Sequence, residues 1–165
     1  MEKTFKIINQ LKEEGIIKDY AVAGAVASIF YIEPITTYDL DIMIVLKEES
    51  DSLISLSTIY DWFRKKGFQF DKEHILIEGI PVQFIPAYSN LVEEALNNSL
   101  EKKYENTLIK VINAEYLIAI MLDTFRQKDK ERILRFIEES EINYGYLNEI
   151  LKKYNLSEKY KSLNI

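Results

Sequence analysis

The chain has 165 residues, of which 47% are hydrophobic and 29% are charged, and it carries a formal net charge of −6. This size and balance indicate one domain with a packed core, and the 5 Gly and 3 Pro argue against disorder. The acidic balance disfavours a protein that holds nucleic acid mainly by neutralising phosphates. No apolar run approaches the roughly 18 residues of a membrane span, and the N-terminal residues lack the apolar segment of a signal peptide. Because cysteine is also absent, we expect a cytoplasmic protein without disulfides.

The first part of the chain alternates between helical and strand patterns. Apolar residues at 5, 7, 8 and 11 follow the helical spacing, and Gly15 is a natural stop. Ser50 can cap a later helix that Gly67 closes. The predicted elements are a helix over 5–14, a strand over 19–23, a short helix over 24–31, a strand over 37–46 and a helix over 50–66.

The second part begins with short strands and ends with helices. The predicted elements are strands over 68–70, 74–77 and 82–85, a tight connection at 78–81, a helix from Ser89 to Asn98, a strand over 108–112, a long helix over 113–139 and a helical pair over 144–154 and 157–163. This order predicts an α/β (α+β) unit with a mixed sheet over residues 1–112. The helices of residues 113–165 form a C-terminal extension, which we expect to pack on that unit as one compact domain.

Asp39 and Asp41 are the most informative residues of the sequence. Alternation along a strand places both side chains on one face, about 7 Å apart along the chain, while Leu40 and Ile42 point into the core. Two carboxylates so placed repel each other unless a cation or solvent lies between them. Mg²⁺ is a hard ion that is usually held by one or two carboxylates together with substrate phosphates and water. The pair therefore suits a complex of Mg²⁺, or Mn²⁺, with a nucleotide.

Gly24 lies upstream of this pair, at a predicted turn from a strand into a helix. A glycine there lets backbone N–H groups approach a phosphate closely, and Ser28 could donate its hydroxyl to the same phosphate. Alone, an Asp-x-Asp is mostly a solvated strand end, and a glycine before a helix is mostly a turn device. The order of strand, glycine turn, short helix and acid-bearing strand favours a functional site, because acids within an apolar strand are costly unless they are used.

The segment 20–45 resembles the signature of the polymerase-beta-like nucleotidyltransferase superfamily, a Gly-Gly or Gly-Ser turn followed by an Asp-x-Asp strand. More narrowly, the chain resembles a group of small bacterial and archaeal members that are distantly related to abortive-infection nucleotidyltransferase toxins. Further similarity over 79–86, 115–119 and 126–132 extends the resemblance over nearly the whole chain. It implies a nucleotidyltransferase fold, with a mixed β-sheet flanked by helices and a C-terminal helical segment.

The resemblance also implies roles for individual residues. Asp39 and Asp41 would bind Mg²⁺ and act in catalysis. The triphosphate would lie against a second set of residues, namely Gly24, Ala25, Ser28 and Lys128. In resembling families a basic-acidic pair, here Lys128 and Asp129, lies near the active-site cleft; otherwise the charges of this helix form a solvated face.

Two residues depart from the superfamily pattern. Ala25 stands where a second Gly or a Ser is usual, which puts one phosphate contact in doubt. Active members carry a third acid on a neighbouring strand, and Gln83 occupies that place here. A neutral amide cannot accept a proton from an attacking hydroxyl, and loss of a general base typically costs about 10²–10⁴-fold in rate. Either Glu78 or another acid substitutes, or the chemistry is slow, or the domain only binds.

Three other features have both a structural and a functional interpretation. His74, the only histidine, lies in a predicted strand and is more simply a surface or structural residue than a metal ligand. Tyr88, Tyr104 and Tyr116 could stack on bases, although scattered tyrosines more often pack at the edge of a core. An apolar helical stripe over 144–154 either seals the core or forms a surface for a homodimer or a partner protein.

These observations lead to three hypotheses. The first is a Mg²⁺-dependent nucleotidyltransferase that transfers a nucleoside monophosphate from a nucleoside triphosphate to an acceptor hydroxyl on RNA, a protein or a small molecule. The second is a catalytically weak or inactive nucleotide-binding domain, which Gln83 motivates. The third is an interaction protein, such as one member of a toxin–antitoxin pair, that binds its partner through the C-terminal stripe. None of the three involves a membrane.

Overall fold

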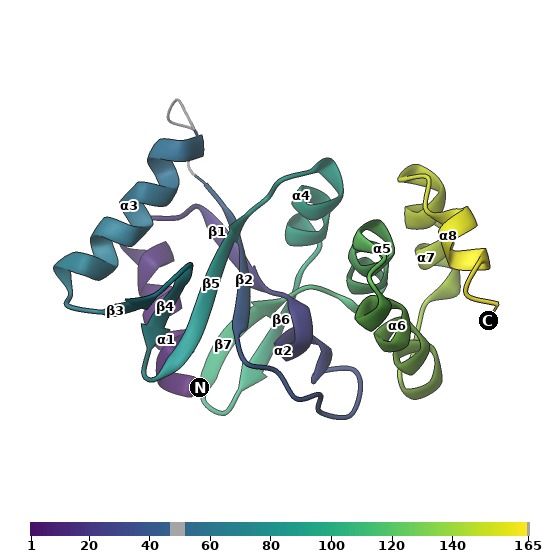
Figure 1. The fold of residues 1–165 in the computed structure, drawn as a ribbon, viewed down its shortest axis with the longest axis horizontal. Helices are drawn as coiled ribbons and strands as arrows, with labels where there is room; N and C mark the ends of the chain where they lie inside the picture. The colour runs from purple at the N-terminus through teal and green to yellow at the C-terminus, as the bar shows by residue number, and fades with distance from the viewer. Residues whose placement is uncertain (47–51, 165) are drawn as a thin grey trace.

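The computed structural model describes residues 1–46 and 52–164. A seven-stranded mixed sheet lies at its centre, with the strand order β3-β4-β5-β2-β1-β7-β6 (Figure 1). The strands are β1 (Asp19–Val22), β2 (Leu40–Val45), β3 (Gln69–Asp71), β4 (His74–Ile77), β5 (Ile80–Pro86), β6 (Leu100–Tyr104) and β7 (Thr107–Val111). The helices are α1 (Glu2–Glu13), α2 (Gly24–Ser28), α3 (Ser52–Lys65), α4 (Asn90–Asn97), α5 (Ala114–Thr124), α6 (Gln127–Glu139), α7 (Tyr144–Lys153) and α8 (Ser157–Lys161). The predicted fold class is confirmed.

Strand β2 is the middle strand of the sheet and carries Asp41. It runs antiparallel to β1 and parallel to β5. Leu40, Ile42 and Ile44 are wholly buried, so one face of the strand belongs to the core and Asp41 lies on the other face. The register with β5 places Asp41 directly beside Gln83. The neighbouring strand predicted to carry the missing third acid is therefore β5.

The helices cover the sheet from two sides. In Figure 1, α3 lies to the left of β1, β2 and β5, and α1 is partly hidden by β3 and β4, whereas α4 and the C-terminal helices lie to the right of β2. The apolar spacing of α1 buries Phe5, Ile8 and Leu11 completely. The side occupied by α2, α4 and α5 is the one toward which Asp41 points, since α2 contacts β2 and the core-facing residues of β2 point the other way.

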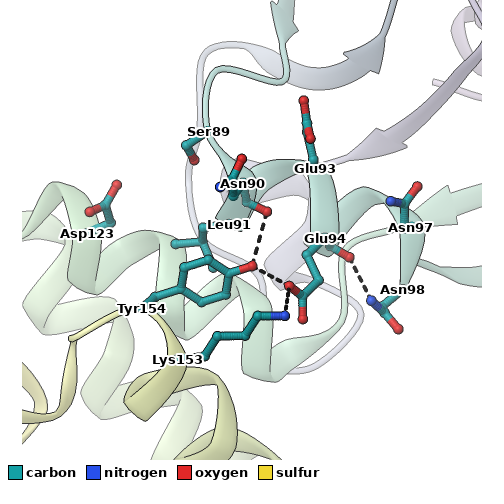
Figure 2. Close-up of a pocket in the computed structure, with 10 residues that line it drawn as sticks. All are labelled: Ser89, Asn90, Leu91, Glu93, Glu94, Asn97, Asn98, Asp123, Lys153 and Tyr154. Atoms are coloured by element: carbon teal, nitrogen blue, oxygen red, sulfur yellow. Dashed lines mark hydrogen bonds and ion pairs between the residues drawn. The ribbon is translucent and has the colours of Figure 1, made fainter.

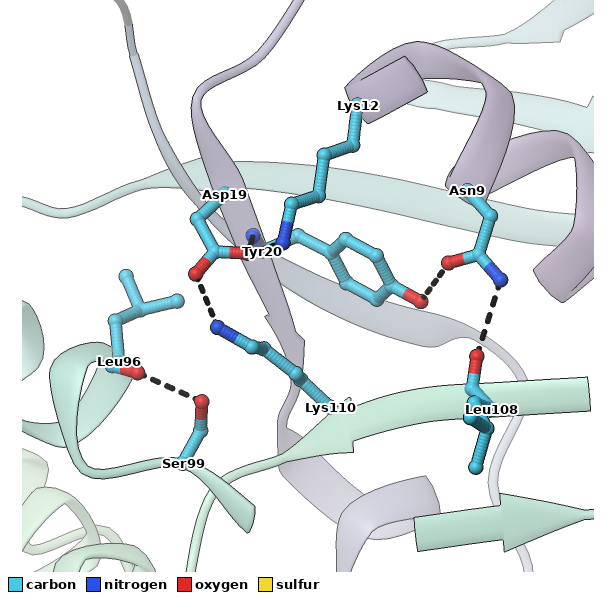
Figure 3. A network of polar contacts seen from close by, with 8 residues as sticks. All are labelled: Asn9, Lys12, Asp19, Tyr20, Leu96, Ser99, Leu108 and Lys110. Atoms are coloured by element: carbon cyan, nitrogen blue, oxygen red, sulfur yellow. Dashed lines mark hydrogen bonds and ion pairs between the residues drawn. The ribbon is translucent and has the colours of Figure 1, made fainter. Parts of the chain in front are cut away.

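A polar network fixes α1 to the sheet (Figure 3). Lys12 donates to Asp19 at 2.8 Å, and Lys110 of β7 also pairs with Asp19. The Tyr20 hydroxyl donates to Asn9 at 2.6 Å. Burial opposes ionisation of Asp19, but the two lysines outweigh it and hold the pKa of this carboxyl below its usual range. The network anchors β1, whose end leads directly into the turn at the candidate site.

The C-terminal helices complete the core. Every residue of α5 from Ala114 to Leu122 is buried, and α5 contacts α2, α4, α6 and α7. In the predicted apolar stripe, Leu147, Ile150 and Leu151 are at most 2% exposed, whereas Tyr144 is 48% exposed. The main apolar residues of the stripe therefore seal the core.

The structure corrects several sequence-based boundaries. The predicted long helix over 113–139 is wrong, because Phe125 adopts a left-handed conformation (φ 51°) and Arg126 an extended one, which separates α5 from α6. Strand β6 was not predicted. The connection at 78–81 is shorter than expected, since Ile80 and Pro81 already belong to β5. The proposed cap Ser50 lies outside the described residues. No helix in the described part of the chain is long and apolar enough to cross a membrane.

Candidate active site

A cavity of about 320 Å³ lies where the sheet meets α2, α5 and α6. Seven residues that the sequence assigned to metal or phosphate binding or to the third-acid position line it, namely Gly24, Ala25, Ser28, Asp39, Asp41, Gln83 and Lys128, whereas Glu78, the suggested substitute acid, does not. They come from α2, from β2 and the residue before it, from β5 and from α6. Folding therefore brings together groups as far apart in the sequence as Gly24 and Lys128.

Gly24 and Asp41 are in close contact across the turn between β1 and α2. Gly24 has φ +59°, and a Cβ added to it would lie 2.0 Å from Asp41 Oδ2. The backbone N–H of Ala23 donates to the Asp41 carbonyl at 2.9 Å, which joins the turn to β2. The turn needs glycine for two separate reasons, its positive φ and the space that the Asp41 carboxylate occupies.

The charge of Asp41 is held in an unfavourable environment. Burial raises the pKa of its carboxyl, and the neighbouring charge of Asp39 raises it further. The cations of Lys128, Arg126 and Arg132 act in the opposite direction without compensating fully. A positively charged ligand near the two acids would relieve this cost, because an opposite charge favours the ionised form.

Asp39 has one neighbour at each of its carboxylate oxygens, of which only Thr37 makes a hydrogen bond. It directly precedes β2, and the Thr37 hydroxyl donates to Asp39 Oδ1 at 3.2 Å. His74 Nε2 lies 3.4 Å from Asp39 Oδ2. Each oxygen still has a lone pair for another partner, so Asp39 is oriented without being saturated.

The donor set fits one hard cation shared with a substrate. Asp39, Asp41 and the amide oxygen of Gln83 are oxygen donors of the kind that Mg²⁺ prefers. Among the described residues, no group of three or more His, Cys, Asp or Glu side chains is placed to hold a metal ion. The remaining ligands of such a cation would have to come from water and from substrate phosphates.

Ser28 lines the cavity but already uses its hydroxyl proton. Its Oγ donates to the Gly24 carbonyl at 3.0 Å, and the residue is 1% exposed. Such a bond to the preceding turn is common for serine within helices. To donate to a phosphate, as the sequence interpretation expects, Ser28 must first give up this bond.

Helix α6 contributes more of the cavity wall than the sequence suggested. Arg126, Asp129 and Arg132 line the cavity with Lys128. Asp129 is wholly buried and accepts hydrogen bonds from Arg126 and from Thr124. Burial opposes its ionisation, but these bonds hold the pKa of Asp129 below its usual range. The charge pattern alone predicts a solvated face for Arg126 and Arg132. Each lies three residues from Asp129, however, and this spacing indicates that both share the side of the helix on which Asp129 lies.

An apolar wall completes the cavity. It consists of Met43, Ile85, Leu117, Ile120 and Met121, and Tyr88 lies at its edge with 56% of its surface exposed. Of the three tyrosines considered for base stacking, only Tyr88 lines this cavity. Tyr104 packs edge-on against Phe5, and Tyr116 is buried and donates to Glu94.

A larger hollow of about 910 Å³ lies beside α4 and the end of α7 (Figure 2). Its central carboxylate, Glu94, accepts hydrogen bonds from Lys153 at 2.5 Å, from Tyr116 at 2.7 Å and from Tyr154. Hydrogen bonds from Lys153 and Tyr154 lower the pKa of Glu94 to about 2. Because these groups are engaged in joining helices, the smaller cavity is the stronger candidate for an active site.

Comparison with known proteins bears on the fold. No protein-family model matches the sequence, and no curated protein sequence matches it either. The structure is similar to the crystal structure of an antigenic nucleotidyltransferase-like protein from Paracoccidioides brasiliensis, with a TM-score of 0.58 and 15% sequence identity. The similarity covers 97% of this chain and 93% of that chain. The chain therefore has a nucleotidyltransferase-like fold along nearly its whole length.

Proposed function

We propose that the protein is a nucleotidyltransferase that transfers a nucleoside monophosphate from a nucleoside triphosphate to an acceptor hydroxyl. The observation that carries the proposal is the meeting, in one cavity, of the acid pair Asp39 and Asp41 with the cations of α6. Phosphoryl and nucleotidyl transfer depend mainly on positioning and charge stabilisation. The nucleotidyltransferase-like fold gives independent support.

In this proposal Asp39 and Asp41 hold Mg²⁺ or Mn²⁺, with the Gln83 amide oxygen nearby. When bound, the ion would neutralise charge on the phosphate oxygens during the displacement. Lys128 and Arg132 of α6, together with Arg126 directly before this helix, would bind the rest of the triphosphate by charge. Gly24 leaves the backbone open beside Asp41, and the apolar wall with Tyr88 would receive the base.

The transfer itself is an in-line displacement. The acceptor oxygen forms a bond to the α-phosphorus, the bond from that phosphorus to the bridging oxygen breaks, and pyrophosphate leaves. The acceptor hydroxyl loses its proton in this step. Gln83 cannot receive that proton because an amide has no basic site at neutral pH, so the proton passes to water or to an acceptor group on the substrate. The lack of a general base at Gln83 therefore favours a slow reaction.

A labelling experiment tests the proposal. The purified protein is incubated with each of the four α-labelled nucleoside triphosphates, Mg²⁺, and separate pools of RNA, protein and small molecules. We expect transfer of label to one pool together with release of pyrophosphate, and loss of both in Asp39→Asn and Asp41→Asn. Asp61→Asn, which alters an exposed acid paired with Arg64 on α3, is the control and should label normally.

A nucleotide-binding domain without transfer is the second candidate, and Gln83 is the observation that favours it. Nucleotide titration with and without Mg²⁺ separates the two. Metal-dependent binding without pyrophosphate release from any pool supports the binding domain. Pyrophosphate release that requires Asp41 rules it out, and absence of nucleotide binding under all conditions contradicts both candidates.

A further inference from the structure

His74 is the first residue of β4, and its ring nitrogen is buried without a hydrogen bond. Nε2 is the only buried side-chain nitrogen or oxygen among the described residues that lacks a hydrogen-bond partner. The side chain is only 13% exposed. An unpaired polar atom in a protein interior is costly and calls for an explanation.

The sheet register places His74 next to the candidate site. Ile75 pairs with Val82 in the antiparallel ladder of β4 and β5, so the preceding residue of β4 lies beside Gln83. Gln83 in turn pairs with Asp41 across β5 and β2. Paired residues of neighbouring strands project to the same face. Asp41, Gln83 and His74 thus form one row across three strands.

The unpaired nitrogen lies against one carboxylate of the acid pair. His74 Nε2 is 3.4 Å from Asp39 Oδ2, while the Thr37 hydroxyl donates to Oδ1 at 3.2 Å. The Tyr38 ring meets the His74 ring edge-on, with centroids 6.5 Å apart. His74 does not line the cavity itself. Any effect it has on a ligand there must therefore act through Asp39.

We propose that His74 is a positioning residue for Asp39, an inference that rests on the proposed function. In this role the imidazole carries a proton on Nε2 and donates a hydrogen bond to Asp39 Oδ2, so that Thr37 and His74 hold the carboxylate from both ends. The 3.4 Å contact is not yet a hydrogen bond, and a small turn of the Asp39 side chain would complete it. Partners of this kind orient a metal-ligating carboxylate and tune its affinity for the ion.

A purely structural role explains the residue less well. If His74 served only packing, an apolar side chain of similar size would fill the site without leaving an unpaired N–H group. A histidine with its donor aimed at Asp39 costs stability unless the donor is used. The neighbouring Tyr38 ring, which lies at 89° to the His74 ring, offers no carboxylate.

Manganese binding in the absence of nucleotide tests this role. We would measure the affinity of wild type, His74→Leu and His74→Gln for Mn²⁺ by electron paramagnetic resonance, and urea unfolding of the same proteins. We expect His74→Leu to weaken Mn²⁺ binding about tenfold, with an unfolding midpoint equal to or above that of wild type. His74→Gln keeps an N–H donor and should remain within about threefold of wild type. In an Asp39→Asn background, His74→Leu should have no further effect.

Each alternative result has a distinct meaning. Equal affinities of wild type and His74→Leu overturn the role of His74 and leave the proposed function intact if Asp41-dependent transfer is observed. If His74→Leu and His74→Gln weaken Mn²⁺ binding equally and both lower the unfolding midpoint, the role of His74 is structural and the inference is overturned. A wild-type protein that binds no Mn²⁺ overturns both the inference and the metal-dependent function.

Discussion

Gly24 shows how one residue links the fold to the site. It combines a positive φ with a contact to Asp41 that leaves no room for a side chain. Gly67 and Gly79 also have positive φ, of +81° and +78°, but a Cβ added to either would meet nothing within 4 Å. The chain therefore offers its own control for separating backbone strain from contact with the acid.

Gly24→Ala should destabilise the protein more than Gly67→Ala does. Both substitutions place alanine in the left-handed region, at a cost of about 1–2 kcal/mol. Only Gly24→Ala also pushes against the Asp41 carboxylate. Urea unfolding measures the difference, and removing the carboxylate in an Asp41→Ala background should reduce the cost of Gly24→Ala to that of Gly67→Ala. Equal costs in the wild-type background would show that Asp41 does not press on the turn.

Asp41 gives a second prediction at this scale, because its pKa is raised by burial and by Asp39. A carboxyl whose native pKa is raised binds protons more readily in the folded state, so its ionisation reduces stability. This cost is absent well below the usual pKa of 3.8, grows as pH rises from there toward the raised native pKa, and is complete above it. Asp41→Asn should therefore be more stable than wild type at pH 7, although we expect it to be inactive in the transfer assay.

Thermal unfolding over a pH series without metal tests whether Asp41→Asn is more stable than wild type. The advantage of Asp41→Asn should shrink as pH falls toward 3.8 and below. Adding Mg²⁺ with nucleoside triphosphate at pH 7 should stabilise wild type and leave Asp41→Asn nearly unchanged. A variant less stable than wild type at neutral pH contradicts the prediction.

At the scale of elements, the junction of α5 and α6 sets the position of the three cations that line the cavity, Arg126, Lys128 and Arg132. Phe125 is left-handed, and the Arg126 backbone N–H donates to Asp129 Oδ2 at 3.1 Å. The Arg126 side chain donates to both oxygens of Asp129, at 2.7 and 3.1 Å. Asp129 thus acts as a cap at the start of α6 and holds Arg126, which lines the cavity.

Asp129→Asn should destabilise the protein by about 2–3 kcal/mol, because it removes a buried charge that accepts charged hydrogen bonds. It should also weaken nucleotide binding by releasing Arg126. Asp123→Asn, an exposed change near the end of α5, is the control and should alter neither property. Urea unfolding and nucleotide titration measure the two effects. Normal nucleotide binding by Asp129→Asn would show that the junction does not position the residues that bind nucleotide.

Most elements could be predicted from local patterns, and the exceptions have physical reasons. The break in the predicted helix over 113–139 contains neither Gly nor Pro, so only the tertiary burial of Asp129 reveals it. Strand β6 contains Glu101, Lys102 and Lys103, and its charged edge-strand pattern offers no apolar alternation to recognise. The position of Gln83 beside Asp41 followed from the resemblance, and the register agrees with it.

The candidate site was predictable where its residues form an ordered motif. The glycine turn and the Asp-x-Asp strand lie close in the sequence, so their order was informative. The sequence favours a structural role for His74 and a solvated helix face for Arg126 and Arg132. Their proximity to the two acids arises only from strand register and helix packing. A single sequence carries no local signal that His74 lies beside Asp39.

At the scale of the whole molecule, the C-terminal helices share one core with the sheet. The buried residues of α7 belong to the same hydrophobic cluster as those of β2 and β5. A polar junction adds to this packing where Glu94 of α4 meets Tyr116 of α5 and the end of α7, at Lys153 and Tyr154 (Figure 2). Helices α4, α5 and α7 are therefore held together by both apolar contacts and ionisable groups.

Glu94→Gln should lower stability at pH 7 by about 1 kcal/mol, once the strength of charged hydrogen bonds is discounted for solvent screening. The native pKa of Glu94 is lowered from 4.5 to about 2. A carboxyl with a lowered native pKa stabilises the fold fully above its unfolded value and loses this contribution as pH falls through the native one. The difference between wild type and Glu94→Gln should therefore close between pH 4.5 and about 2.

Urea unfolding at a series of pH values measures this closure. Glu93→Gln is the matched control, since Glu93 is the exposed neighbour whose side chain points away from Lys153 and Tyr154 (Figure 2). Its stability difference from wild type should stay small at every pH. Because the helices share the core of the sheet, we expect a single unfolding transition in every variant. Unfolding of the C-terminal helices before the rest of the protein in acid would instead show that Glu94 is their main attachment. A constant difference for Glu94→Gln across the series would show that its charge does not hold the junction.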